Sequence, residues 1–251
     1  VPAPERARLL LDHLAGELRH ALRSLARSPV FSVVAVLSLA LGIGCATVFF
    51  CAVNAVLLRP QPLLSAPEQL VAVAAADVDS PWGPVSFPEL GDVRGGVPAL
   101  AGVAAVASRS FTVSTAGGGE LTFEGEVVSE EYFEVLGVTF PLGRGFASED
   151  TASSWRVAVL GHSAWLRDFA GDPSVLGRTI RVNGQDHTVV GVAPAGLQRW
   201  RQPTSADLWL PVESTWRAAR GHCAFQLVGR LCPGATVAQV QAQLDRVSAR
   251  L

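Results

Sequence analysis

The hydrophobic pattern of the chain is dominated by one uninterrupted apolar segment, residues 28–58, in which no residue is charged. A helix that crosses a hydrocarbon core needs about 20 apolar residues, whereas the apolar part of a cleaved signal peptide spans about 7–15. Ser28 and Pro29 are typical of a helix start, and Pro60 cannot continue a helix. The pattern therefore predicts one transmembrane helix over 28–58.

Small residues recur every four positions within this segment, at Ser38, Gly42 and Ala46. This spacing lets a second helix approach closely in a membrane. A composition rich in Ala and Gly produces the same spacing without a partner helix, and the sequence does not separate the two explanations.

Residues 1–27 carry an apolar helical stripe and a basic one. The stripes consist of Leu11, Leu14, Leu18, Leu22 and Leu25, and of Arg19, Arg23 and Arg27. They predict an amphipathic helix on the cytoplasmic leaflet, with a soluble helix packed on protein as the alternative. Arginine is concentrated before the apolar segment, and only Arg59 follows it closely. The positive-inside rule therefore places the N-terminus in the cytoplasm and residues 59–251 outside it.

The rest of the chain alternates between short strand and helix patterns, which predicts a mixed α/β body in an α+β fold. The predicted strands cover 70–76, 100–107, 109–115, 120–129, 156–160, 179–182, 187–192, 207–210 and 224–231. The predicted helices cover 86–93, 130–136, 163–169 and 236–250. Ser86 and Glu89 predict a capping box at the start of the first helix, and Gly137 is expected to stop the second. Hairpin turns are predicted at residues 117–119 and 183–184, which are rich in Gly and Asn.

Composition excludes several classes of protein. Of the 251 residues, 49% are hydrophobic and 17% are charged, which excludes a disordered chain. The net charge is −2, so no basic field favours nucleic acid as a partner. The sequence contains no Lys and no P-loop, whose phosphate contacts need a lysine. ATP hydrolysis is therefore expected from a partner chain.

One motif resembles part of an enzyme active site. The segment 161–163 (Gly-His-Ser) follows a predicted strand and precedes a predicted helix, which is typical of a hydrolase nucleophile. However, Trp165 stands where the strained turn needs a glycine-sized residue, and His187 or His222 is only a weak candidate for the base. Helix N-capping by Ser163 is the simpler interpretation, so an esterase is the third hypothesis.

The other chemistry-bearing residues predict no site. The acidic pairs 130–131 and 149–150 are interpreted as solvated surface. Cys223 and Cys232 flank a predicted strand, which holds them too far apart for a disulfide. No metal-ligand spacing connects the histidines, which are His13, His20, His162, His187 and His222. We assign no catalytic, cofactor-binding or metal-ligating residue and expect no cofactor.

The tryptophans are interpreted as core residues of the second half of the extracytoplasmic body. They are Trp82, Trp155, Trp165, Trp200, Trp209 and Trp216. The alternative is that Trp200 and Arg201 form an exposed edge that binds a partner.

Five stretches carry a resemblance to a known family. They read ALRSLARSPVFSVVAVLSLALGIGCATVFFCAVNAVLLRP (Ala21–Pro60), VSEEYFEVLGVTFPLGRGF (Val128–Phe146), VAVLGHSAWLRDFAGDPSVLGRTIRVNGQDHTVVGVAP (Val157–Pro194), DLWLP (Asp207–Pro211) and GRLCPGATVAQVQAQL (Gly229–Leu244). Together, and in this order, they resemble the N-terminal portion of MacB-like and FtsX-like ABC-transporter permeases.

The resemblance implies a bacterial inner-membrane protein with a two-lobed extracytoplasmic domain. One lobe would combine residues 60–150 with 220–251, and residues 154–216 would form an inserted lobe. The implied partners are a separate ATPase subunit, other permease spans or a second permease copy, and the lipid bilayer. Permeases of this family carry further spans after this domain, so we expect residues 1–251 to be a fragment or a natural truncation.

The sequence therefore predicts a non-enzymatic function. We expect the N-terminal part of an ABC-transporter permease subunit, whose outer domain engages a partner or substrate and relays ATP-driven motion through the span. The alternative is a single-span envelope sensor or scaffold protein without transport activity.

Overall fold

The computed structural model describes residues 29–53, 64–77, 80–114, 119–153, 156–219, 221 and 223–249. The chain divides into two compact units, Val1–Arg59 and Pro60–Leu251. The predicted amphipathic helix over 1–27 and most of the predicted turn at 117–119 lie outside the described residues.

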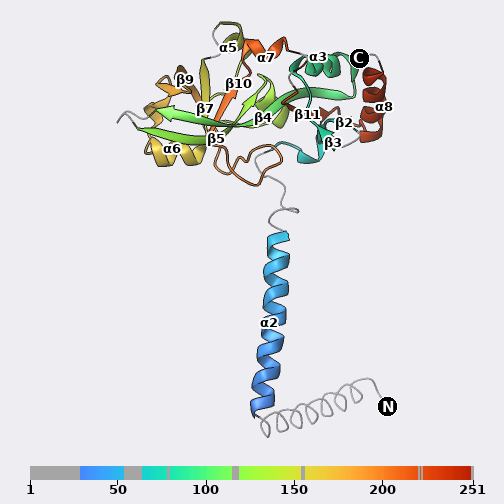
Figure 1. Ribbon diagram of the computed structural model, residues 1–251, viewed down its shortest axis with the longest axis vertical. Coiled ribbons are helices and arrows are strands. Elements are labelled where there is room, and N and C mark those ends of the chain that lie inside the picture. The colour runs from blue at the N-terminus through green and yellow to red at the C-terminus, as the bar shows by residue number, and fades with distance from the viewer. Residues whose placement is uncertain are drawn as a thin grey trace, which may run out of the picture. The chain divides into compact units, whose positions relative to one another are not determined.

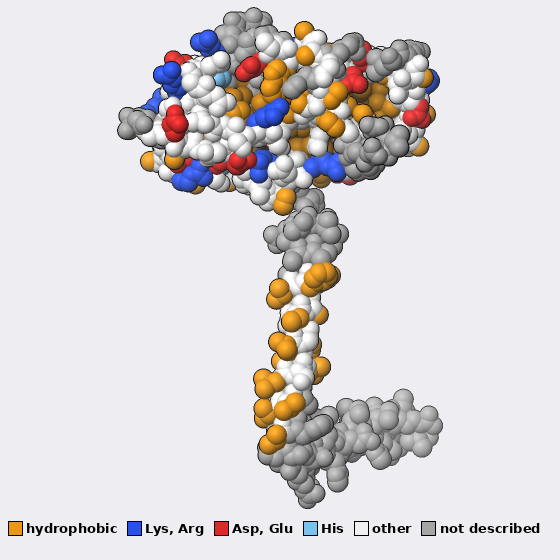
Figure 2. Space-filling model, in the orientation of Figure 1, with side chains coloured by type: hydrophobic (Ala, Val, Ile, Leu, Met, Phe, Trp, Pro, Cys, Tyr) orange, Lys and Arg blue, Asp and Glu red, His pale blue; other side chains and the backbone are white. Residues whose placement is uncertain are grey.

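The first unit contains helix α2 (Pro29–Val53), which lies within the predicted apolar segment. Apolar side chains along α2 are exposed, including Leu41 at 71% and Phe49 at 72% (Figure 2). No helix in the described part of the chain is long and apolar enough to cross a membrane. The transmembrane helix expected over 28–58 is therefore not confirmed and stays a prediction.

The second unit is built on one nine-stranded sheet and a separate two-stranded hairpin (Figure 1). The strands of the large sheet are β1 (Leu70–Val73), β4 (Leu100–Ser114), β5 (Glu120–Val128), β6 (Leu142–Gly143), β7 (Val157–Leu160), β8 (Thr179–Val182), β9 (Gln185–Val192), β10 (Leu208–Pro211) and β11 (Gln226–Leu231). The hairpin consists of β2 (Ala75–Asp77) and β3 (Ser80–Gly83). The mixed α/β body expected from the sequence is therefore present.

Six strands of the large sheet close into a barrel. The sheet runs in the order β1-β11-β4-β5-β10-β7-β9-β6, and β8 pairs with both β4 and β9. Because β8 joins these two strands, the path β4-β5-β10-β7-β9-β8 returns to its start. Strands β11 and β1 continue the sheet on the other side of β4. The barrel is mixed, since β5–β10 and β7–β9 are parallel pairs and the others are antiparallel.

Strand β4 belongs to both parts of the sheet. Its first half pairs with β11, its second half pairs with β5, and its last two residues pair with β8. The sequence predicts two strands over 100–107 and 109–115, whereas the structure has one strand of 15 residues. The break expected at Ser108 does not occur, because its backbone stays in register with Glu126 of β5.

Alternating side chains divide the domain into two apolar cores. One core fills the barrel and continues beneath β11. Its barrel members include Phe111, Phe123, Val127, Leu160, Val182, Val189, Leu208 and Leu210. The other core lies on the opposite face of the same strands and contains Tyr132, Phe133, Val159 and Trp209. A one-residue change of register would exchange these two sets, so burial on both faces fixes the strand pairing.

Helices cover the first core at both ends of the domain. Helices α3 (Phe87–Gly96) and α8 (Val237–Ser248) pack on its β11 side, and α6 (His162–Asp168) lies at the opposite end of the domain (Figure 1). The second core is covered by α4 (Tyr132–Leu136). The other helices among the described residues of this unit are η2 (Pro67–Gln69), α5 (Ser148–Ser153), η3 (Pro173–Val175) and α7 (Ser214–Arg217).

Local signals in the sequence fix several of these boundaries. The backbone N–H of Ser86 donates to Glu89 Oε2 over 2.6 Å, which is half of the expected capping box at the start of α3. Gly137 ends α4 with a φ of 67°. Asn183 and Gly184 have φ values of 49° and 80°, as a two-residue hairpin turn between β8 and β9 requires.

The two expected lobes share one sheet. Strands β7, β9 and β10, from residues 154–216, lie on one side of β5. Strands β1, β4 and β11, from 60–150 and 220–251, lie on the other side. The short β6, from the first of these ranges, pairs instead with β9. The division into lobes stays a prediction.

The parallel pair β5–β10 depends on a glycine. A Cβ on Gly125 would collide with the carbonyl oxygen of Leu208, its register partner. We expect Gly125→Ala to lower the free energy of unfolding by about 1–3 kcal/mol through this collision. Thermal unfolding followed by tryptophan fluorescence measures the effect.

The matched control is Gly91→Ala in α3, where a Cβ meets no atom within 4 Å. This change is expected to raise stability by about 0.4–1 kcal/mol, because it removes freedom from the unfolded chain. Equal stability of the two variants would contradict the assigned register of β5 and β10.

Candidate functional site

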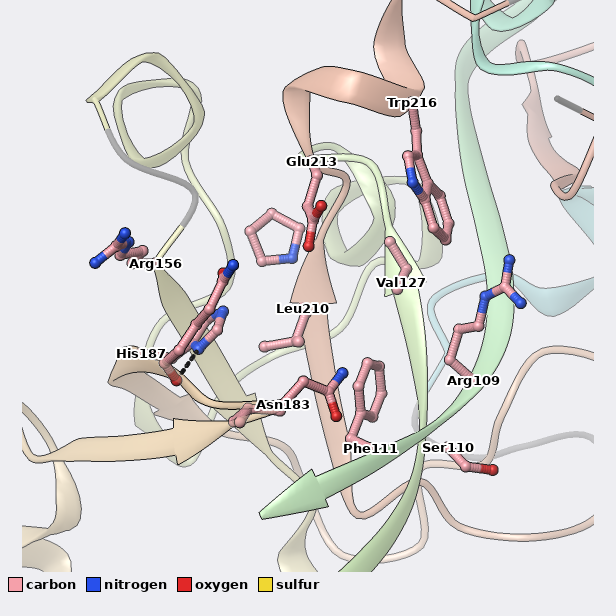
Figure 3. A pocket seen from close by; sticks show the side chains of 13 residues that line it. Arg109, Ser110, Phe111, Val127, Arg156, Asn183, His187, Leu210, Glu213 and Trp216 are labelled. Carbon is pink, nitrogen blue, oxygen red and sulfur yellow. Dashed lines mark hydrogen bonds between the residues drawn. The ribbon is translucent and has the colours of Figure 1, made fainter. Parts of the chain in front are cut away.

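The barrel has a cavity of about 540 Å³ at one mouth, beneath α7. This volume lies within the range of about 300–1,000 Å³ that is usual for small-molecule sites. Apolar side chains from β4, β5 and β10 line its inner part, namely Phe111, Val127 and Leu210 (Figure 3). Val182 of β8 also belongs to the lining. The cavity is therefore a place where the first core is accessible from outside.

Charged side chains surround this apolar part. Arg109 on β4 and Arg156, directly before β7, lie on opposite sides of the cavity, with Leu210 and Val127 between them (Figure 3). Glu213 precedes α7 and also lines the cavity. Among the described residues, neither arginine side chain has a hydrogen-bond or ion-pair partner. The charged groups of the lining thus comprise two guanidinium groups and one carboxylate.

Helix α7 is held over the cavity by contacts that flank it. Arg217 Nη2 donates to Glu130 Oε2 over 2.6 Å, and its guanidinium carbon lies 5.0 Å from the ring centre of Phe87. The ring of Trp216 packs edge-on against Phe225 at a centroid distance of 5.8 Å. These contacts fix Trp216, whose ring stacks with the Arg109 guanidinium at 4.9 Å.

The opposite wall is the β8–β9 hairpin, whose tip is fastened to β4. Asn183 Oδ1 accepts from the backbone N–H of Thr112 over 2.9 Å, and the Asn183 N–H donates to the Thr112 carbonyl over 2.8 Å. These bonds complete the barrel beside the cavity. The turn residue Asn183 therefore both shapes the hairpin and positions the wall.

His187 lies in this wall with 7% of its surface exposed. Its Nδ1 lies 3.1 Å from the Gln185 carbonyl oxygen, so the ring donates there. Burial lowers the pKa of His187 below 6.5, and the positive charge of Arg156 lowers it further, against the opposing effects of that hydrogen bond and of Glu213. The ring is therefore neutral at pH 7 and leaves the positive charge of the cavity to the two arginines.

A buried carboxylate organises the second core. Glu126 on β5 is fully buried. Its Oε2 accepts from the Tyr132 hydroxyl over 3.0 Å and from Trp209 Nε1 over 2.9 Å, and its Oε1 accepts from the backbone N–H of Trp200 over 2.7 Å. Glu126 thereby joins β5, α4, β10 and the segment before β10.

The start of the domain is fastened by Arg230 on β11. Its Nε donates to the Val135 carbonyl over 2.7 Å, and its Nη1 donates to the Ala66 carbonyl and to Gln69 Oε1, both over 3.4 Å. The Ser65 hydroxyl donates to the Gly137 carbonyl over 3.1 Å. These bonds, which we call the 65–69 clamp, tie the first described residues of the second unit to the end of α4 and to β11.

The hydrolase-like motif does not form a nucleophile elbow. Gly161 is the N-cap of α6, with a φ of −71°, and Ser163 is absent from the residues with positive φ. The expected N-cap role of Ser163 is also wrong, because α6 begins at His162, one residue earlier. No backbone strain therefore presents Ser163 as a nucleophile.

The interpretation of the acidic pairs as solvated surface holds for the exposed Glu149 and is wrong for Glu130, Glu131 and Asp150, which are partly buried in ion pairs. Glu130 binds Arg217, Glu131 lies 2.9 Å from Arg94, and Asp150 lies 2.6 Å from Arg144. Arg217 and Arg94 lie far from Glu130 and Glu131 in the sequence, whereas Arg144 precedes Asp150 by six residues, so distant partners decide the environment of the first two carboxylates.

The tryptophans and cysteines mostly follow expectation. Trp209 is fully buried, and Trp165 and Trp200 pack against the two cores, so Trp200 is not an exposed edge. Cys223 and Cys232 are free, in agreement with the absence of a disulfide between them. His13, His20, His222, Trp155 and the side chain of Trp82 lie outside the described residues.

Sequence reasoning missed the cavity and Glu126. Alternation along β5 places Glu120, Glu124 and Glu126 on one face, which reads as a solvated face. Only the packing of α4 and the segment before β10 buries Glu126. No local sequence pattern marks Arg109 and Arg156 as parts of one site, because they line the same cavity only when the barrel closes.

A family model described as the MacB-like periplasmic core domain matches residues 32–247. Among curated proteins, the probable export ATP-binding/permease protein MacB of Pseudomonas entomophila (strain L48) is 31% identical over 87 residues, which cover 35% of this chain and 13% of that protein. The probable syringafactin export ATP-binding/permease protein SyfD of Pseudomonas syringae pv. syringae (strain B728a) gives the same identity and coverage. The match thus spans about one eighth of the length of these relatives.

A solved structure is similar in fold. The periplasmic region of MacB from Actinobacillus actinomycetemcomitans superimposes with a TM-score of 0.54 at 19% identity. The match covers 67% of this chain and 74% of that one. At this identity the likeness concerns the fold.

Glu126 makes stability depend on pH. Burial raises the pKa of Glu126 above the 4.5 of an exposed glutamate, and its three hydrogen bonds only partly oppose this. The unfolded chain releases the proton near pH 4.5, whereas the folded protein holds it to a higher pH. The contribution of Glu126 to stability therefore falls as pH rises from 4.5 through the folded-state pKa.

Glu126→Gln removes this titration and turns an amide N–H toward one of the three donors, at a cost of about 1–3 kcal/mol. We expect the stability advantage of the wild type over the variant to be largest near pH 4.5 and to shrink toward pH 7.5, in chemical denaturation followed by tryptophan fluorescence. Glu120→Gln on the same strand is the control and should leave the pH dependence unchanged. An unchanged pH dependence in Glu126→Gln would refute the assignment.

Proposed function

Because the chain belongs to the family of MacB-like periplasmic core domains, we propose that it is the N-terminal part of an ABC-transporter permease subunit. The extent of the family match carries the proposal, since it runs from residue 32, inside the apolar segment, to residue 247, in α8. One family model thus covers both most of the apolar segment and the domain that follows it, so this chain combines the two as the family does. This favours a permease over the single-span sensor or scaffold.

In this proposal residues 28–58 anchor the chain in the bacterial inner membrane, the N-terminus is cytoplasmic, and 59–251 form the extracytoplasmic domain. Support comes from the absence of charge over 28–58 and from the arginines that precede it. The exposed apolar side chains of α2 suit a lipid environment. Partners would be an ATPase subunit, and other permease spans or a second permease copy that contact the anchor.

The domain would engage a partner or substrate and move with the anchor when the ATPase works. The 65–69 clamp supports this relay, because it binds the chain that follows the anchor to α4 and β11. Strand β11 pairs with β4, and β4 reaches the barrel. Force applied at residue 65 would therefore pass into the sheet through backbone hydrogen bonds. No catalytic step is assigned to the chain.

The orientation can be tested with a cysteine that the protein already has. Cys223 is exposed, and we expect a membrane-impermeant maleimide to label it in intact spheroplasts of cells that express the chain with Cys232→Ser. The labelled protein should be recovered in the membrane fraction after alkaline carbonate extraction. Adding Cys223→Ser should abolish the label. Labelling only after lysis, or recovery in the soluble fraction, would contradict the proposed topology.

The clamp can be tested by hydrogen exchange. Arg230→Gln removes a charged donor with three acceptors, and such bonds are worth about 1.5–3 kcal/mol each. We expect amide exchange over residues 66–70 to accelerate by about tenfold or more, because the N–H groups of Gln69 and Leu70 lose the support of the clamp. Arg178→Gln, at an exposed arginine on the β8 side, is the control. Unchanged exchange in both variants would exclude a clamp role for Arg230.

A further inference from the structure

We propose that the cavity at the barrel mouth binds a small amphipathic anion, with its acidic group on Arg109 and its apolar part against Phe111, Val127 and Leu210. The proposal goes beyond the permease function and does not depend on it. It gives the domain a ligand-binding site of defined chemistry.

The first argument is the state of the two arginines. Arg94, Arg144, Arg167, Arg199 and Arg217 form ion pairs with carboxylates elsewhere in the described structure. In the described residues, Arg109 and Arg156 have no such partner, and they are the exposed arginines at the rim of a cavity whose inner part is apolar. A guanidinium group beside low-dielectric walls attracts anions more strongly than one that faces open water.

The second argument is the orientation of Arg109. Its guanidinium group stacks with the Trp216 ring at 4.9 Å, and Trp216 is itself fixed against Phe225. Stacking leaves the N–H groups in the guanidinium plane free to donate to an oxyanion. It also reduces the rotamer entropy that Arg109 would lose on binding. Arg109 is thus prepared to bind a carboxylate or sulfonate through two donors.

The third argument is the sign of the charge. Glu213 is the one acidic side chain in the lining, and the neutral His187 adds no charge at pH 7. Two guanidinium groups against one carboxylate favour a ligand with net negative charge. The apolar inner part requires that the rest of the ligand be apolar, and the volume of about 540 Å³ accommodates a ring system or a medium-length chain.

The test uses naphthalene-2-sulfonate, an aromatic anion that stays charged at every working pH. The purified full chain is kept in a nonionic detergent, and binding is measured by equilibrium dialysis against the detergent alone. We expect saturable binding of the sulfonate. Its neutral isostere, naphthalene-2-sulfonamide, should bind about tenfold more weakly, because it lacks the charge that Arg109 recognises.

Variants of the lining should change affinity in opposite directions. Arg109→Gln should weaken sulfonate binding by about three- to tenfold, and Glu213→Gln should strengthen it by about two- to threefold. Arg178→Gln, which removes an arginine outside the cavity, should leave it unchanged. Because Arg109→Gln also removes the contact with Trp216, Arg156→Gln provides a second weakening variant with no ring contact to lose.

The proposal is overturned if binding does not exceed that of the detergent alone, or if sulfonate and sulfonamide bind equally. It is also overturned if the two cavity arginine variants match Arg178→Gln. None of these results bears on membrane topology, so failure here leaves the permease proposal standing, and the converse also holds.

Discussion

Backbone pairing along β4 is the constraint on which the rest of the extracytoplasmic domain depends. This one strand hydrogen-bonds with β11, β5 and β8 along its 15 residues. Its N-terminal half supports the helices α3 and α8 through the first core, and its C-terminal half forms part of the barrel. The two halves cannot shift independently, because a change of register in one would displace the side chains of the other from their core.

The polar groups of the domain depend on the same arrangement. Glu126 lies on the outer face of β5 because Phe123 and Val127 face the barrel interior. The loss of hydration at Glu126 is compensated by donors from Tyr132 and Trp209, and from the backbone of the segment that closes over it. Glu126 is satisfied only when α4, β10 and the segment before β10 all pack against β5. Packing of these three segments on the outer face of the barrel is therefore cooperative.

Sequence reasoning recovered the local part of this structure. The capping box at Ser86, the left-handed Gly137 and the Asn183 turn are short-range signals, and each was found where the pattern placed it. The mixed α/β body and the family also followed from the sequence. Closure of the barrel did not, because the pairing of β8 with β4 joins strands about 70 residues apart and leaves no periodic trace.

The candidate site was unpredictable for the same reason. Arg109 lies at an exposed position of an ordinary strand, and Arg156 lies in a connection. Their common cavity exists only after residues from β4, β5, β8, β9 and β10 meet. Glu126 carries a misleading signal, because strand alternation places it on the same face as Glu120 and Glu124, which are exposed.

The contact between the β8–β9 hairpin and β4 is the place where the ring of six strands closes. Among the described residues, two pairs join β8 to β4, and the Asn183–Thr112 bonds reinforce them at an exposed tip. In the described part of the chain this seam is shorter than the β4–β5 ladder, so separating β8 from β4 costs less than separating β5 from β4, and it uncovers Val182 of the first core. A molecule that contacts both the β8–β9 hairpin and β4 would bind the closed barrel and not the opened one, and would stabilise the closed form more as its concentration exceeds its dissociation constant.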